Sequence, residues 1–274
     1  MIVFSRLIRR LFVIVIFLAI LSLGWWLYQK NNITAPTCTD GIKNGQEEGV
    51  DCGVLACGID CLLELGSPRV ISKKLIPAGT QDYDFVAEVK NQHTDFGASE
   101  VAYELTLFNG NGQQLLNREG VFYILPGQTK FLVLPFLTAE RNVSDIDFKI
   151  KSSVWQKVSS MEGVNLSVVR QSYTVLEGGK SSALEAVVLN DSDFDFDTVD
   201  IDVILRDQNG LVVAVNKSEI NTLLAHTERG FRVVWPFPIV ENVSEVDIMP
   251  STNLFDNYNF IKRYGSGFEQ FQQY

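Results

Sequence analysis

Two related stretches of sequence decide the fold: Val101-Ala-Tyr-Glu-Leu-Thr-Leu-Phe-Asn-Gly-Asn-Gly112 and Val199-Asp-Ile-Asp-Val-Ile-Leu-Arg-Asp-Gln-Asn-Gly210. In each, apolar side chains alternate with mostly small or polar ones, which is the period of two expected of a β-strand with one buried face. Each stretch then reaches an Asn-Gly pair, which is typical of a turn between strands. The chain therefore carries the same strand and turn twice.

Further matches surround this strand at an offset of about one hundred residues. The matched segments are Phe85–Asn91 with Leu184–Asn190, Phe131–Leu134 with Phe231–Val234, and Asn142–Asp147 with Asn242–Asp247. Their common order indicates an internal duplication, and each copy of roughly ninety residues is large enough for one hydrophobic core. Short β-rich runs between turn residues predict an all-β class, namely two tandem β-sandwiches. The repeat is longer than a solenoid or propeller unit, so we expect two separate beads.

A different kind of segment precedes the duplication. Residues 11–28 (LFVIVIFLAILSLGWWLY) form an apolar run that, as a helix, spans about 27 Å, close to the roughly 30 Å hydrocarbon core of a bilayer. Three arginines precede the run and only Lys30 follows it closely, which favours a cytoplasmic N-terminus. We therefore expect one transmembrane helix, with the bulk of the chain outside the cell membrane. A cleaved signal peptide is the alternative, because Ser22-Leu-Gly24 offers a small-x-small cleavage site.

The charges are distributed unevenly along the chain. The formal net charge is −10, and all 33 acidic residues follow Lys30. So acidic a surface argues against nucleic acid or anionic lipid as a ligand. It is compatible with divalent cations.

The cysteines lie close together, just after the apolar run. They are Cys38, Cys52, Cys57 and Cys61. Outside the cytoplasm, four such cysteines indicate two disulfide bonds, with three pairings open. Zinc is the alternative, because four thiolates can form a tetrahedral site, although the spacing lacks a pair of C-x-x-C knuckles.

Two acidic loops are candidate calcium sites, since oxygen ligands on short loops are what calcium prefers. The residues of the first are Asp40, Asn44, Glu47 and Asp51, and those of the second are Asp191, Asp193 and Asp195, in a run of aspartates that continues with Asp197 and is followed by Asp200 and Asp202. The spacing of the first loop does not fit an EF-hand. A solvated turn is the alternative for both loops. In the second, the intervening phenylalanines would then enter the core.

The segment Cys38-Thr-Asp-Gly-Ile-Lys-Asn-Gly-Gln-Glu-Glu-Gly-Val-Asp-Cys-Gly53 resembles a cysteine-rich motif of predicted bacterial and archaeal surface proteins. That motif runs C-x-D-G-x-x-N-x-x-E-x-x-V-D-C-G-G-x-C-x-x-C. The second half departs from it, because Val54 replaces a glycine and each later cysteine gap is one residue longer. The resemblance implies display at the cell surface, and no known activity.

The duplicated segments resemble immunoglobulin-like modules of the CARDB or FxLYD type. In these, an alternating strand is followed by Leu-x-Pro-Gly-x-Thr before another strand. The first copy carries Ile124-Leu-Pro-Gly-Gln-Thr129, whereas the second has Leu223-Leu-Ala-His-Thr227. The resemblance implies two immunoglobulin-like sandwiches with an adhesive or spacer role and no active site.

Motifs of common enzymes are missing from the sequence. No Gly-x-Ser-x-Gly, P-loop, dinucleotide fingerprint or His-Glu-x-x-His occurs, and the two histidines, His93 and His226, occupy different places in the repeat. We therefore expect a non-enzymatic protein that binds, adheres or acts as a spacer at the envelope. Its partners would be the bilayer, through residues 11–28, and an unidentified extracellular or envelope protein, with no cofactor unless calcium. The alternatives are an accessory subunit of a secretion or pilus system, and an enzyme with a cryptic carboxylate or metal site.

The predicted organisation has six segments. They are a cytoplasmic N-terminus at 1–10, the transmembrane helix at 11–28, a cysteine-rich collar at 29–63, immunoglobulin-like modules at 64–152 and 160–250, and an aromatic and polar tail at 251–274.

Overall fold

The computed structural model describes residues 2–31, 38–47, 50–58, 65–80, 82–139, 143–158 and 160–264. Strands dominate this part of the chain, which holds twelve strands, three α-helices and one 3₁₀ helix, so the predicted all-β class is confirmed. Two compact units are present: the N-terminal unit (Met1–Leu65) and the β unit (Gly66–Tyr274). Each is described by itself.

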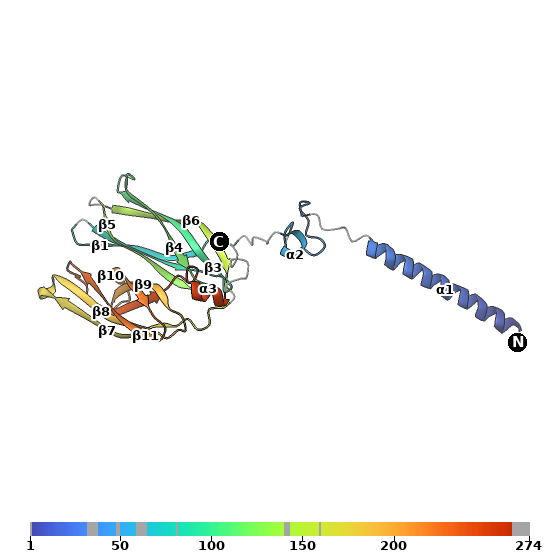
Figure 1. The fold of residues 1–274 in the computed structure, drawn as a ribbon. Helices are drawn as coiled ribbons and strands as arrows, with labels where there is room; N and C mark the ends of the chain where they lie inside the picture. Colours follow the sequence, from blue (N-terminus) through green and yellow to red (C-terminus); the bar gives the residue numbers. More distant parts are fainter. Residues whose placement is uncertain are drawn as a thin grey trace. The chain divides into compact units, whose positions relative to one another are not determined.

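The N-terminal unit begins with a long helix, α1 (Ile2–Asn31), drawn in blue in Figure 1. The predicted span of residues 11–28 lies within it. From Phe12 to Trp26, every residue of α1 is exposed. Among the described residues, no helix meets the combined length and hydropathy required to cross a membrane. A second, short helix, α2 (Val54–Cys57), lies in the cysteine-rich segment.

The first half of the β unit consists of two three-stranded antiparallel sheets, with strand orders β1-β2-β5 and β4-β3-β6. The strands are β1 (Arg69–Ala78), β2 (Asp82–Lys90), β3 (Phe96–Asn109), β4 (Gln114–Ile124), β5 (Thr129–Thr138) and β6 (Val143–Lys157). The sheets share one hydrophobic core, in which Phe85, Leu105 and Leu107 are fully buried. Alternate residues of β3 enter this core, as the period of two predicts.

The second half repeats this topology strand for strand, with sheet orders β7-β8-β11 and β10-β9-β12. Its elements are β7 (Leu166–Leu176), η1 (Glu177–Gly179), β8 (Ser181–Asn190), β9 (Phe196–Asp207), β10 (Val212–Leu223), β11 (Thr227–Trp235), β12 (Val243–Ser251) and α3 (Tyr258–Tyr264). Trp235 is fully buried in the core of this half, and its indole N–H donates to the carbonyl oxygen of Val215 at 3.0 Å.

The strand register defines which residues of the two halves correspond. Val89 pairs with Lys130 in the first half, and Val188 pairs with Arg229 in the second. Because Val89 and Val188 each lie two residues before the asparagine that ends the matched segment, Lys130 corresponds to Arg229.

One match made in the sequence is therefore out of register. Phe231 corresponds to Leu132, not to Phe131. A slip of one residue moves a side chain to the other face of its sheet. Accordingly, Phe231 lies in the core of the second half, whereas Phe131 lies outside the core of the first half.

A third hydrophobic cluster, hereafter the interface, joins the two halves of the β unit. Its buried residues are Ile76, Val86 and Val133 from the outer face of sheet β1-β2-β5, and Ile204 and Val215 from the outer face of sheet β10-β9-β12. All five are at most 5% exposed. Burial of each such side chain stabilises by about 1.5–3 kcal/mol. The expectation of separate beads did not include this contact, which makes the halves one compact unit.

Candidate functional site

The cysteine-rich segment is closed covalently. Cys38 and Cys57 form a disulfide bond, which confirms the predicted chemistry for this pair, and Cys52 is also disulfide-bonded. The fourth cysteine, Cys61, lies outside the described residues. A sulfur bonded to another sulfur is not available as a thiolate, so the structure gives no support to the zinc alternative at Cys38 and Cys57.

The four candidate calcium ligands of this segment come together, but they bind one another and the backbone. The Asp51 carboxylate accepts the N–H groups of Asp40 (2.9 Å) and Gly41 (2.8 Å). The Asp40 carboxylate accepts the side-chain amide of Asn44 at 2.8 Å, and Glu47 accepts the backbone N–H of Asn44 at 3.0 Å. These bonds fix the loop without a metal, and calcium binding here stays a prediction.

A metal-sized group of ligand atoms occurs once among the described residues. Cys38, Glu47 and Cys57 bring their ligand atoms within 4.8 Å of one another. Two of these three atoms are the sulfurs of the disulfide bond. This group therefore offers one carboxylate to a cation, which is too few for a calcium site.

The second candidate calcium loop does not converge on one point. Asp193 lies 3.3 Å from Nε2 of His226 and 3.4 Å from Nη1 of Arg263, while Asp191 lies 3.8 Å from Nδ1 of the same histidine. Asp195 instead accepts the backbone N–H of Ala225 at 2.8 Å. Ser192 and Phe194, which lie between these aspartates, and Phe196, which follows Asp195, are buried. The loop thus has the alternation expected of a solvated turn whose phenylalanines enter the core.

A polar cluster lies beside the interface and was not singled out in the sequence. The hydroxyl of Tyr123 is 2.9 Å from Oδ2 of Asp200 and 3.0 Å from Oγ of Ser251. Nζ of Lys130 donates to Ser251 at 3.4 Å and lies 3.4 Å from the ring centroid of Tyr123. Asp202 faces the same region. The cluster thus joins β4 and β5 of the first half to β9 and β12 of the second.

Burial dominates the electrostatics of this polar cluster. Tyr123, Lys130 and Asp202 are each 8% exposed. Desolvation raises the pKa of Asp202 to about 7, with Lys130 opposing and Asp200 reinforcing the shift. Desolvation also lowers the pKa of Lys130 and raises the pKa of Tyr123 above its usual value. Each of these groups therefore favours its neutral form more than it would in water.

A second buried carboxyl belongs to Asp84, near the start of β2 in the first half. Asp84 is 1% exposed and accepts the backbone N–H of Phe136 at 2.9 Å. Phe136 has a φ of 57°, which is strained for a residue other than glycine. Burial raises the pKa of Asp84 to about 6, although the hydrogen bond from Phe136 opposes the shift. Asp84 thus helps to hold a strained residue inside β5, at the irregularity in its pairing with β2.

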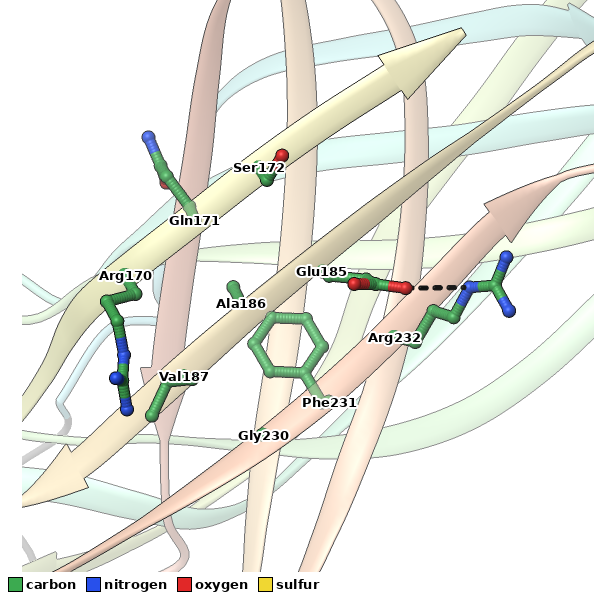
Figure 2. Close-up of a pocket in the computed structure, with 9 residues that line it drawn as sticks. All are labelled: Arg170, Gln171, Ser172, Glu185, Ala186, Val187, Gly230, Phe231 and Arg232. Atoms are coloured by element: carbon green, nitrogen blue, oxygen red, sulfur yellow. Dashed lines mark ion pairs between the residues drawn. The ribbon is translucent and has the colours of Figure 1, made fainter. Parts of the chain in front are cut away.

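A shallow groove of about 530 Å³ lies on the outer face of sheet β7-β8-β11 (Figure 2). Gly230 lies opposite Val187 in this sheet, and without a side chain it leaves space above the backbone. An ion pair between Glu185 and Arg232 (3.5 Å) flanks the groove. The lining combines charged side chains with the apolar residues Ala186, Val187 and Phe231, and the groove is open to solvent.

A smaller cavity of about 150 Å³ adjoins Asp200, and its lining is rich in oxygen. The other lining residues are Asp197, Thr198, Thr252, Asn253, Asp256 and Asn257. Several of these side chains already have partners. Thr252 donates to the carbonyl of Thr198 at 2.8 Å, and Asn257 donates to that of Asp195 at 2.8 Å. The hydrogen bonds of Thr252 and Asn257, which precede α3, therefore account for the polar lining of this cavity.

Comparison with known proteins identifies no family. No family model matches the chain, and no curated protein matches it. Solved structures with partial similarity include red sea bream transglutaminase, at 12% identity and a TM-score of 0.22, covering 73% of this chain and 30% of that one. A β-glucuronidase of Bacteroides uniformis has 13% identity and a TM-score of 0.18, covering 63% and 22%. The chain thus spans less than a third of either protein, and similarity this low carries no argument about activity.

Proposed function

We propose that this protein is anchored in a cell membrane by α1, with its N-terminus in the cytoplasm and the remainder outside. The exposed apolar surface of α1 carries the proposal. Phe17 is 61% exposed and Trp25 is 67% exposed, within a run that has no charged residue between positions 11 and 28. A continuous apolar surface of this kind is costly in water and stable in a bilayer.

The disulfide chemistry supports the same compartment. Disulfide bonds persist in oxidising environments and are rare in the cytosol. The bond between Cys38 and Cys57 follows α1 closely in the sequence, and this supports an outer location for the cysteine-rich segment.

For the β unit we propose two immunoglobulin-like sandwiches with a non-enzymatic role in binding, adhesion or spacing. Two three-stranded antiparallel sheets around one core, repeated in the same order, support this assignment. The interface joins the pair into one compact unit, which suits a spacer or a presenting surface.

Membrane fractionation of the full chain, carrying a C-terminal tag, tests the proposal. The protein should stay in membranes washed with carbonate, its tag should be cut by protease added to intact cells, and its thiols should be unreactive until reduced. Substituting Phe17→Arg should release much of it, because a charge at mid-span costs about 2.5–3.5 kcal/mol of insertion.

The matched control is Val240→Arg, because Val240 is also apolar and 90% exposed but lies in the β unit. Release of the unsubstituted protein by carbonate, or four reactive thiols, would contradict the proposal. A stoichiometric complex that persists in mild detergent would instead favour an accessory subunit of an envelope assembly over a free-standing protein.

A further inference from the structure

The polar cluster beside the interface combines groups that water normally solvates. Its members are Tyr123, Lys130, Asp200, Asp202 and Ser251. They come from both halves of the β unit, so the cluster can be buried only while the halves are docked. Any change in its charge is therefore coupled to docking.

Asp202 is the least compensated member of the cluster. Its side chain lies on the same face of β9 as Ile204, two residues further along the strand, at the centre of the interface. Its side chain is 8% exposed, and its carboxyl is influenced by burial and by nearby charges, with no hydrogen bond contributing. A buried carboxylate without a partner is expensive, whereas the protonated acid is tolerated.

The charged groups around Asp202 do not remove this cost. Lys130 on β5 and Lys217 on β10 favour the carboxylate, whereas Asp200 on β9 disfavours it. The hydroxyl of Tyr123 on β4 is engaged with Asp200 and with Ser251 on β12. Lys130 donates to Ser251 and lies over the ring of Tyr123, so its ammonium group is also shared.

We propose that this cluster is a proton-sensitive clasp, which holds the two halves together in mildly acidic solution and loosens them as Asp202 ionises.

The direction of this pH dependence follows from the raised pKa of the Asp202 carboxyl. A free aspartic acid ionises near pH 4, and Asp202 in the docked protein does so at about 7. Between these two pH values, Asp202 is therefore protonated while the halves are docked and ionised when they are separated. The stabilisation is complete below about pH 4 and is lost as the pH rises through about 7. Between about pH 6 and about pH 8, the docking equilibrium should fall roughly tenfold.

The strand register supplies a matched control. Asp202 pairs with Met249 on β12, and Glu104 pairs with Lys149 on β6, so Glu104 is the counterpart of Asp202 in the first half. Glu104 lies on an open sheet face and pairs with Lys151 at 2.8 Å. The variants Asp202→Asn and Glu104→Gln therefore remove the same charge from equivalent positions, one docked and one open.

Hydrogen exchange of the full chain in mild detergent, at about pH 6 and about pH 8 and corrected for intrinsic exchange, tests the clasp. In the unsubstituted protein, protection should fall roughly tenfold at the higher pH in β5, β9 and β10, while β3 and β8 keep theirs. Asp202→Asn should abolish this loss by raising protection at the higher pH, and Glu104→Gln should retain it.

Three results would overturn the clasp. These are an unchanged pH response in Asp202→Asn, a lost response in Glu104→Gln, and a loss of protection spread evenly over all strands. If Asp202→Asn folds poorly, ¹³C detection of the Asp202 carboxyl in the unsubstituted protein decides the matter, because an ionisation near pH 4 also contradicts the proposal.

Discussion

Sheets β1-β2-β5 and β7-β8-β11 are equivalent in topology but have opposite outer faces. In the first half, Val86 and Val133 are buried in the interface. The register places Glu185 and Arg232 at the corresponding positions of the second half, where they form an exposed ion pair. Gly230 stands where the first half has Phe131. A few outward residues therefore decide which of two similar sheets is covered and which stays open to water.

The other two sheets, β4-β3-β6 and β10-β9-β12, differ in the opposite way. Here the outer face is open in the first half and covered in the second. Ile204 pairs with Val215 on the docked face of the second half, and Thr106 pairs with Asn117 at the same positions of the first half. The amide of Asn117 donates to Glu104 at 2.8 Å, so this face is satisfied without a covering layer. Apolar outward residues thus occur in one sheet of each equivalent pair, and those two sheets meet.

The largest expected effect comes from replacing two buried valines of the interface by the charged residues that occupy the same positions on sheet β7-β8-β11. The double variant Val86→Glu and Val133→Arg should separate the halves, because charged groups in the interface lose their solvation. We expect a loss of at least ~4 kcal/mol in the free energy of unfolding. Denaturant unfolding followed by tryptophan fluorescence measures it. A loss below ~1 kcal/mol would show that the interface contributes little.

A smaller loss should follow removal of one interface side chain. Ile204→Ala should cost about 2–4 kcal/mol, because Ile204 is fully buried and leaves a cavity. Its counterpart variant Thr106→Ala should cost about 0.5–1.5 kcal/mol, because Thr106 is buried but loses only a methyl group and one hydrogen bond from Asn117. Equal losses in the two variants would contradict the contrast between the faces.

The two halves also differ at Asp84, whose counterpart in the register is the buried Ala183. Asp84→Ala should cost about 1–3 kcal/mol, since the N–H of Phe136 loses its acceptor. Because the pKa of Asp84 is raised to about 6, its carboxyl favours the folded state below pH 4 and loses that contribution as the pH rises through about 6. In Asp84→Asn, thermal midpoints should therefore vary less between these values, and an unaltered pH profile would speak against this assignment.

The converse substitution should change association more than stability. Replacing both Glu185 and Arg232 by valine makes the open face resemble the docked one. Exposed apolar patches promote contacts between molecules, so sedimentation of the full chain in detergent should reveal oligomers that grow with concentration. The unsubstituted protein serves as the control. A variant that sediments as the unsubstituted protein does would show that docking needs more than these positions.

The smallest effect on the β unit is expected from reduction of the disulfides. All four cysteines precede residue 66, so a reductant should leave the unfolding midpoint of the β unit unchanged. The cysteine-rich segment itself should lose about 3 kcal/mol, as expected for closure of a loop of this size. Calorimetry with and without reductant distinguishes the two units, and a shifted β-unit transition would indicate that they are energetically coupled.

The strands could be predicted from the sequence, but the packing of the two halves against each other could not. Alternation in Val101–Leu107 and the turn at Asn111-Gly112 predict β3 and its turn, because both are local signals. The roles of Phe194 and Phe196 as core residues also follow from alternation. Ile204 lies between buried Val203 and Leu205 in sequence, so it reads as one more core residue until its outward direction is known.

The polar cluster was missed for a related reason. Asp200 and Asp202 follow a run of exposed aspartates, so in the sequence they resemble two further residues of a solvated loop. What distinguishes them is the arrival of Lys130 and Tyr123 from the other half of the β unit, a contact between residues far apart in sequence. The available signal was the change from Thr106 to Ile204 in the two aligned strands, whereas the matching change from Asn117 to Val215 needs the register of β4 and β10.

The interface joins non-equivalent sheets of two equivalent halves, so it has no two-fold axis. A contact of this kind is a step of an open helix, since each added copy would present the next face to a further copy. The ion pair of Glu185 and Arg232 occupies the face on which a third copy would sit. Its charges oppose such stacking, because both groups would lose their solvation on burial.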